Sequence, residues 1–88
     1  MNPKTTAFAG TLESSDVFVE ISPGGDGIAL ELESVVKEQF GDAIESAVRD
    51  VLKQFGVDSA VVSMKDRGAL ECTIRARVET AVRRAASA

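Results

Sequence analysis

The chain has 88 residues and a formal net charge of −4, and it contains one cysteine but no histidine, tryptophan or tyrosine. This length fits a single domain, which we place at residues 1–88. One cysteine excludes an internal disulfide, and the lack of histidine removes the commonest general base and metal ligand. Hydrophobic residues make up 44% of the chain, which predicts a globular protein with a core of aliphatic side chains and four phenylalanines.

Charge is distributed unevenly along the chain. Residues 1–50 contain ten acidic and three basic residues, whereas residues 51–88 contain four acidic and seven basic ones. The acidic half argues against nucleic-acid binding, which needs a cationic surface. No apolar run approaches the length of a membrane span and no signal peptide opens the chain, so we expect no membrane association and a cytoplasmic location.

The first half of the chain has the pattern of a small sheet. Residues 1–7 are polar and are expected to be loose, and residues 8–12 have the character of a short strand. Apolar residues alternate with others in residues 17–21 and again in 28–32, which is the period of a strand. A turn-forming run, residues 22–27, separates these two segments. The pattern predicts a hairpin with one apolar face and one partly acidic face.

The second half has the pattern of two helices separated by a strand. Apolar residues recur at three- and four-residue steps from Val36 to Phe55, which predicts an amphipathic helix with Gly56 as its C-terminal cap. Residues 58–65 alternate like a strand, and residues 66–68 form a turn. The apolar stripe of the second helix consists of Leu70, Ile74, Val78, Ala81 and Val82. This order predicts an α+β fold in which two helices pack on one face of a sheet of three to four strands.

A polar cluster of four residues, Glu13 to Asp16, lies ahead of the first alternating strand. Nucleophilic catalysis needs a serine beside an oriented base, and a chain without histidine offers Ser14 and Ser15 no such base. Two or three carboxylate oxygens in one turn also fall short of a cation shell. From composition alone the favoured interpretation is a solvated turn, with no catalytic residue and no metal site.

The glycine-rich run from Gly24 to Gly27 has two interpretations, a phosphate-binding loop and a turn. No Gly-Lys-Ser/Thr follows the run, and the next element is a strand rather than a helix. The pattern therefore favours a hairpin turn.

The second helix carries two further features. Cys72 falls away from the apolar stripe on a helical wheel, and we expect an unreactive thiol that a neighbouring segment covers. The arginines of this helix are Arg75, Arg77, Arg83 and Arg84. They fit contacts to a phosphate or an acidic partner, and they equally fit a solvated helix flank. The sequence leaves both interpretations open.

One stretch of the chain, Ala9-Gly10-Thr11-Leu12-Glu13-Ser14-Ser15-Asp16-Val17, resembles the N-terminal signature of the citrate lyase acyl carrier family. The resemblance continues through residues 38–44 and 50–52, and then through Gly-Ala-Leu-Glu-Cys at 68–72 and Ile-Arg-Ala-Arg-Val-Glu at 74–79. It therefore covers nearly the whole chain. Family members often carry a longer C-terminal tail than the one that ends at Ala88.

The resemblance implies that Ser14 carries a prosthetic group, phosphoribosyl dephospho-coenzyme A, through a phosphodiester. It implies three partners: an alpha subunit that transfers acyl groups, a beta subunit that cleaves citryl to oxaloacetate, and an enzyme that attaches the group. The terminal thiol of the group would carry acetyl and citryl thioesters. The chain would then be a carrier subunit without activity of its own, which agrees with the missing catalytic base.

Two alternatives stay open. A carrier subunit of a malonate decarboxylase-type complex would use the same kind of arm, and an interaction module without any arm would bind partners through its acidic hairpin face. A carrier of the four-helix type is disfavoured, because such carriers place their serine in Asp-Ser-Leu, which does not occur here.

Overall fold

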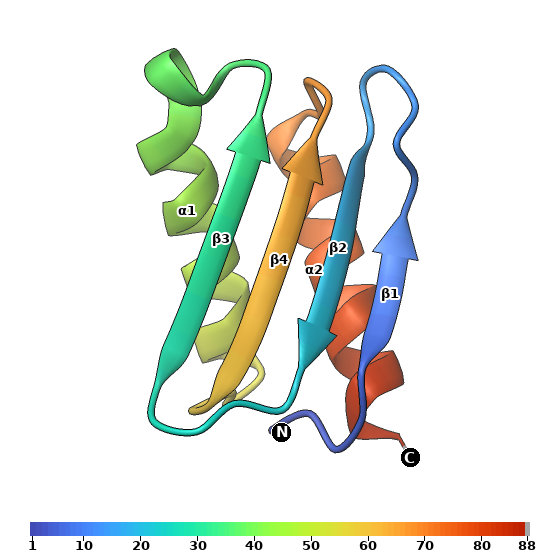
Figure 1. Cartoon of the computed structure of the whole chain (residues 1–88), viewed down its shortest axis with the longest axis vertical. Coiled ribbons are helices and arrows are strands. Elements are labelled where there is room, and N and C mark those ends of the chain that lie inside the picture. Colours follow the sequence, from blue (N-terminus) through green and yellow to red (C-terminus); the bar gives the residue numbers. More distant parts are fainter. Residues whose placement is uncertain (88) are drawn as a thin grey trace.

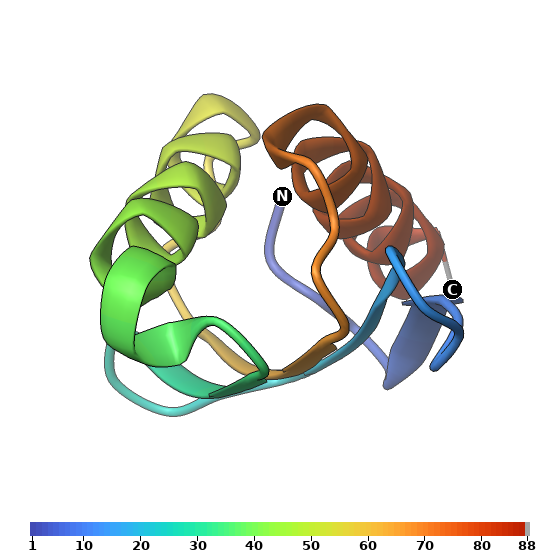
Figure 2. The same ribbon diagram turned by 90° about the horizontal axis from the view of Figure 1, so that it is seen from above.

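The computed structural model describes residues 1–87. The elements in chain order are β1 (Ala7–Gly10), β2 (Val17–Ser22), β3 (Ile28–Ser34), α1 (Lys37–Gln54), β4 (Ala60–Asp66) and α2 (Glu71–Ala86). The four strands form one sheet, and both helices cover the same face of it, so that the other face is bare (Figure 1, Figure 2). The predicted α+β fold is confirmed. Neither helix within residues 1–87 is long and apolar enough to cross a membrane.

The strands lie in the order β1-β2-β4-β3. β2 pairs antiparallel with β1 and with β4, and β4 pairs parallel with β3 across the helical crossover α1. The prediction that β2 and β3 form a hairpin is therefore wrong, because β4 lies between them. Period-two alternation tells which face of a strand is buried, and it carries no information on which strand pairs with which.

The connection between β2 and β3, residues 23–27, crosses the start of β4. It must span two strand spacings of roughly 4.8 Å each, which a two-residue turn cannot do. Two hydrogen bonds tie it to the segment that it crosses: the Ser59 hydroxyl donates to the Gly25 carbonyl at 2.7 Å, and the Ala60 amide donates to the Gly27 carbonyl at 3.2 Å. The glycine-rich run is a crossover loop and not a hairpin turn.

The core lies between the sheet and the two helices. Alternate side chains of β2 and β4 point into it and are completely buried, as the strand pattern predicts; the largest are Val17, Val19, Ile21, Val62 and Met64. The helices contribute Ile44, Ala47, Val48, Val51, Leu52, Ile74, Val78, Ala81, Val82 and Ala85. Because the buried positions of each helix recur at three- and four-residue steps, one stripe per helix faces the sheet.

The end of α1 is a glycine cap. Gly56 has a φ of +64°, a conformation that glycine adopts without steric cost. Its amide donates to the Lys53 carbonyl at 3.0 Å, and the Val57 amide donates to the Leu52 carbonyl at 2.9 Å. This pair of bonds is the Schellman motif, and it confirms the predicted cap.

The N-terminal segment, which the sequence predicts to be loose, makes hydrogen bonds near the C-terminal ends of both helices. The Met1 amino group donates to the Gly56 carbonyl at 3.0 Å, and the Lys4 amide donates to the Ala85 carbonyl at 2.9 Å. The Asp58 amide donates to the Asn2 side chain at 2.7 Å. The last carbonyl groups of a helix lack hydrogen-bond donors within the helix, so amide and amino groups of a neighbouring segment can bind to them.

The first turns of both helices are less buried than their sequence pattern predicts. Phe40 of α1 is 54% exposed, and Leu70, the residue that caps α2, is 71% exposed. Burial begins one turn later, at Ile44 and Ile74. Both helices start at the same end of the molecule, where the loop from β1 to β2 also lies (Figure 1).

Candidate functional site

The loop between β1 and β2 is a tight turn with two serines at its tip. The Asp16 amide donates to the Glu13 carbonyl at 3.1 Å, which leaves Ser14 and Ser15 as the central residues. Ser15 has a φ of 65° and Ser14 has no positive φ, which is the sign pattern of a type II turn. Both serines are exposed. The turn therefore offers two accessible hydroxyls in a defined backbone conformation.

Gly10 shapes the entry to this loop. It ends β1 with a φ of +90°, and a Cβ at this position would collide with the carbonyl oxygen of Val17. Only glycine lets the two strands approach so closely here.

Asp16 holds the turn through its carboxylate. The Thr11 hydroxyl donates to one oxygen at 2.7 Å, and the Val17 amide donates to the other at 2.7 Å. Arg77 of α2 donates from Nε and Nη2 at 3.1 and 3.0 Å, a bidentate pair. The bonds from Thr11, Arg77 and Val17 lower the pKa of Asp16 from 3.8 to about 2. The carboxylate is therefore ionised at neutral pH and fastens the loop to α2.

A second set of bonds fastens the turn to the loop between β4 and α2. The Ser15 amide donates to the Arg67 carbonyl at 2.8 Å, and the Arg67 amide donates to the Asp16 carbonyl at 2.9 Å. These backbone bonds hold Ser15 in its conformation with a positive φ. This conformation costs free energy for a residue other than glycine, and it persists because the surrounding bonds hold it.

The loop that receives these bonds is itself anchored by a buried carboxylate. Asp66, at the end of β4, is only 2% exposed. It accepts hydrogen bonds from the Ser34 hydroxyl at 2.7 Å and from the Ala69 amide at 2.9 Å. Its carboxylate therefore joins the ends of β3 and β4 to the start of α2. Sequence reasoning recognised a turn after Asp66 but not the buried anchor.

The charges and side chains of the turn define what it can do chemically. Glu13 and Asp16 contribute two negative charges, and Arg77 offsets one of them. Within residues 1–87, no three His, Cys, Asp or Glu side chains gather so as to hold a metal ion. No basic side chain of the turn is placed to activate a serine. The arrangement suits a hydroxyl that another protein modifies.

The four arginines of α2 all have partners in the chain. Arg77 binds Asp16, and Arg75 binds Asp50 at 2.7 Å and Glu71 at 3.2 Å. Arg83 binds Glu79 at 3.2 Å and lies over the Phe55 ring. Arg84 donates a hydrogen bond to the Phe8 carbonyl at 2.8 Å. The pairs with Asp50 and Glu71 raise the pKa of Arg75. These contacts fit the helix-flank interpretation for three of the arginines. Arg77 is instead part of the loop anchor, 61 residues from Asp16, a separation that leaves no local sequence signal.

Cys72 is exposed in the first turn of α2. The prediction that a neighbouring segment covers it is wrong, because its side chain is in contact with solvent.

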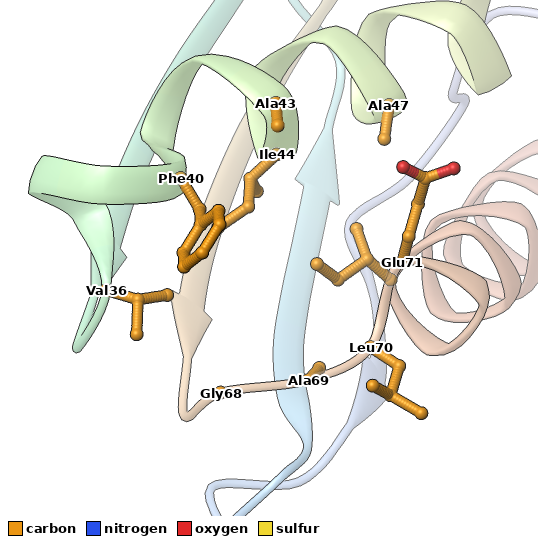
Figure 3. A pocket seen from close by; sticks show the side chains of 10 residues that line it. Val36, Phe40, Ala43, Ile44, Ala47, Gly68, Ala69, Leu70 and Glu71 are labelled. Atoms are coloured by element: carbon orange, nitrogen blue, oxygen red, sulfur yellow. The ribbon is translucent and has the colours of Figure 1, made fainter.

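Beside the turn lies an apolar cleft of about 350 Å³. One wall comes from the first turns of α1, and the other from the loop and first turn that start α2. Its lining residues are Val36, Phe40, Ala43, Ile44, Ala47, Gly68, Ala69, Leu70, Glu71 and Ile74. Figure 3 shows Phe40 and Ile44 facing the strip from Gly68 to Glu71 across the opening. Sequence reasoning assigned most of these side chains to the core and so missed the cleft.

Comparison with known proteins agrees with the resemblance. The family model described as malonate decarboxylase delta subunit matches residues 4–85. The chain is 60% identical over 81 residues to a protein of Salmonella typhimurium named citrate lyase acyl carrier protein 2, covering 91% of this chain and 84% of that protein. It is 58% identical over 87 residues to the citrate lyase acyl carrier protein of Klebsiella pneumoniae, covering 98% and 90%. A relative of the same name from Lactobacillus acidophilus is 51% identical over 85 residues, covering 97% and 88%.

The fold also has a match among solved structures. A chain in the crystal structure of a Pseudomonas malonate decarboxylase hetero-tetramer in complex with malonate superposes with a TM-score of 0.82. The identity is 18%, and the match covers 93% of this chain and 84% of the other. At that identity the similarity concerns the fold alone. The sequence relatives and the family model together show that this chain belongs to the family of citrate lyase acyl carrier proteins.

Proposed function

We propose that this chain is the acyl carrier subunit of a cytoplasmic citrate lyase complex and that Ser14 is the residue that bears its prosthetic group, phosphoribosyl dephospho-coenzyme A. The observation that carries the proposal is the exposed Ser14 hydroxyl on an anchored turn, in the register of the family signature. An attaching enzyme must reach this hydroxyl and must supply the base that the turn lacks.

The residues of the turn fit such a group. A phosphodiester at Ser14 adds negative charge beside Glu13 and Asp16, and Arg77 compensates the charge of Asp16. Water at this exposed turn screens what repulsion remains. When bound, the group supplies a thiol that carries acetyl and citryl as thioesters. Thr11, Asp16 and Arg77 keep the attachment point in one orientation, while the rest of the domain contributes a compact body.

The partners in this proposal are an alpha subunit that transfers acyl groups and a beta subunit that cleaves the citryl group. A tethered substrate reaches a high effective concentration at each partner active site, so the carrier itself needs no catalytic side chain. Relatives named as citrate lyase acyl carrier proteins, at 51 to 60% identity, support this assignment.

The test is a pair of matched variants at the two serines. Ser14→Ala is compared with Ser15→Gly, because glycine tolerates the positive φ at position 15 whereas alanine would strain it. Each protein is incubated with the attaching enzyme and its cofactor precursor, weighed intact, and assayed for citrate cleavage with the alpha and beta subunits. We expect Ser14→Ala to lose both the mass increment and the activity while it stays folded, and Ser15→Gly to keep both. An arm located on Ser15 by fragmentation, or an active Ser14→Ala complex, contradicts the assignment.

A second candidate, the carrier of a malonate decarboxylase-type complex, is favoured by the description of the family model. The identities of 51 to 60% with citrate lyase carriers favour the first candidate. Supplying the holo carrier with citrate or malonate and the subunits of each complex separates the two. Oxaloacetate from citrate supports the first candidate, and decarboxylation of malonate without citrate cleavage supports the second. A protein that never gains an arm would instead be an interaction module.

A further inference from the structure

We propose that the apolar cleft between α1 and the Gly68–Glu71 segment receives the pantetheine part of the arm attached at Ser14. The inference rests on the proposed function, and it assigns a role to a surface that an attachment site alone does not need. The arm would rest against the carrier between its visits to partner active sites.

The first observation is continuity between the turn and the cleft. The Ser15 amide donates to the Arg67 carbonyl at 2.8 Å, and Gly68, the next residue, lines the cleft. Since consecutive Cα atoms are about 3.8 Å apart, this path places the start of the cleft on the order of 10 Å from Ser14. In phosphoribosyl dephospho-coenzyme A, the phosphoribosyl unit and the nucleotide lie between Ser14 and the pantetheine. When extended, these parts are longer than this gap, so the pantetheine of an arm at Ser14 reaches the cleft without any movement of the backbone.

The second observation is the chemistry of the cleft. Its volume of about 350 Å³ falls in the range of about 300–1,000 Å³ that is typical of ligand pockets. Its lining is apolar apart from the single carboxylate of Glu71, so it suits the methyl and methylene groups of pantetheine. No cation lines it, so the phosphates of the arm stay outside in water.

The third observation is that large apolar side chains flank the cleft without cover. Phe40 is 54% and Leu70 is 71% exposed, at positions where the helix pattern predicts burial. An occupant that covers them gains hydrophobic free energy. Because the arm is tethered, its effective concentration is in the millimolar range, and even weak contacts keep it docked much of the time.

The first measurement uses the methyl resonances of the holo protein and of Ser14→Ala, which carries no arm. We expect the methyl groups of Ala43, Ile44 and Ile74 to shift between the two proteins. Those of Ala29 and Val61, on the bare face of the sheet, serve as the control and are expected to stay in place. Equal or absent changes at both sets overturn the proposal.

The second measurement is the rate at which a bulky alkylating reagent modifies the arm thiol, with coenzyme A as the free reference. Cys72→Ser is the background, because the exposed Cys72 thiol would also react. If the arm is docked about two-thirds of the time, alkylation slows about threefold. Ala43→Phe fills the cleft and should restore the rate of the free reference. Ser46→Phe adds the same ring at an exposed position of α1 outside the cleft and should not.

The outcomes separate this inference from the proposed function. An intact mass without an arm overturns both. An arm on Ser14 whose thiol reacts like free coenzyme A in every variant, with unshifted cleft methyls, overturns the docking alone. Slower alkylation that Ala43→Phe abolishes and Ser46→Phe preserves supports the docking.

Discussion

The two ends of the helix pair are built in different ways. Towards their C-termini, α1 and α2 bury Val48, Leu52, Val78 and Val82 almost completely, at 0 to 1% exposure. At their N-termini the same stripes end in exposed apolar side chains and an open cleft. A periodic apolar stripe therefore becomes core only along the length where the sheet and the neighbouring helix cover it.

We call the end with the N-termini of both helices the open end, and the end with their C-termini the closed end. At the open end, a polar network takes the place of apolar packing. Asp16 joins the serine turn to α2, and Asp66 joins β3, β4 and the loop before α2. The closed end is held by hydrophobic burial, and the open end by hydrogen bonds and charge. This division lets the open end present the serine turn and the cleft on a fixed frame. Three predictions test it, from the largest effect to the smallest.

Removing one leucine at each end should have unequal consequences. Leu52→Ala leaves a cavity in the closed end and should lower the free energy of unfolding by about 2–5 kcal/mol. Leu70→Ala removes a side chain that is mostly in water and should change it by no more than about 0.5 kcal/mol. Urea unfolding of both variants provides the measurement. Similar losses in the two variants would remove the distinction between the ends.

The open end should lose stability when Asp16 loses its charge. Because the folded pKa of Asp16 lies near 2, below its usual 3.8, its stabilisation is present above pH 4 and is lost as the pH falls through 2. Asp16→Asn should therefore be less stable than the natural protein by on the order of 1–2 kcal/mol at pH 7, and the difference should shrink towards pH 2.

Urea unfolding at pH 7 and near pH 2 tests this prediction. Glu45→Gln is the control, since its ion pair with Arg49 is exposed and is worth about 0.3–0.5 kcal/mol at most. A difference between Asp16→Asn and the natural protein that does not depend on pH would mean that the charge of Asp16 does not hold the loop.

The smallest effect is expected at Cys72, which is exposed beside the open end. Cys72→Ser should change the free energy of unfolding by less than about 0.5 kcal/mol and should leave citrate cleavage by the reconstituted complex largely intact. The assay is kcat of that complex. A loss of about a hundredfold in a folded variant corresponds to roughly 2.7 kcal/mol of transition-state stabilisation and would place Cys72 in the reaction after all.

Several features predicted from sequence that depend on neighbours a few residues apart are confirmed. They are the alternation of β2 and β3, the amphipathic α1 and its Gly56 cap, and the turn after Asp66. The assignment of Ser14 as the attachment site is of another kind and stays a prediction, because it comes from the family signature. Two adjacent exposed serines give chemistry no means to choose between them.

The amino-acid sequence by itself determined the local elements, because helix and strand periodicity and capping act within a few residues. Only the tertiary structure decided that β4 lies between β2 and β3, that Arg77 binds Asp16 from 61 residues away, and that the N-terminal segment ties down both helix ends. Each of these joins parts of the chain that are distant in sequence, and a local pattern carries no record of such a partner. The exposure of Phe40 was also decided by the tertiary structure, since the burial of an apolar helix stripe depends on which other elements pack against it.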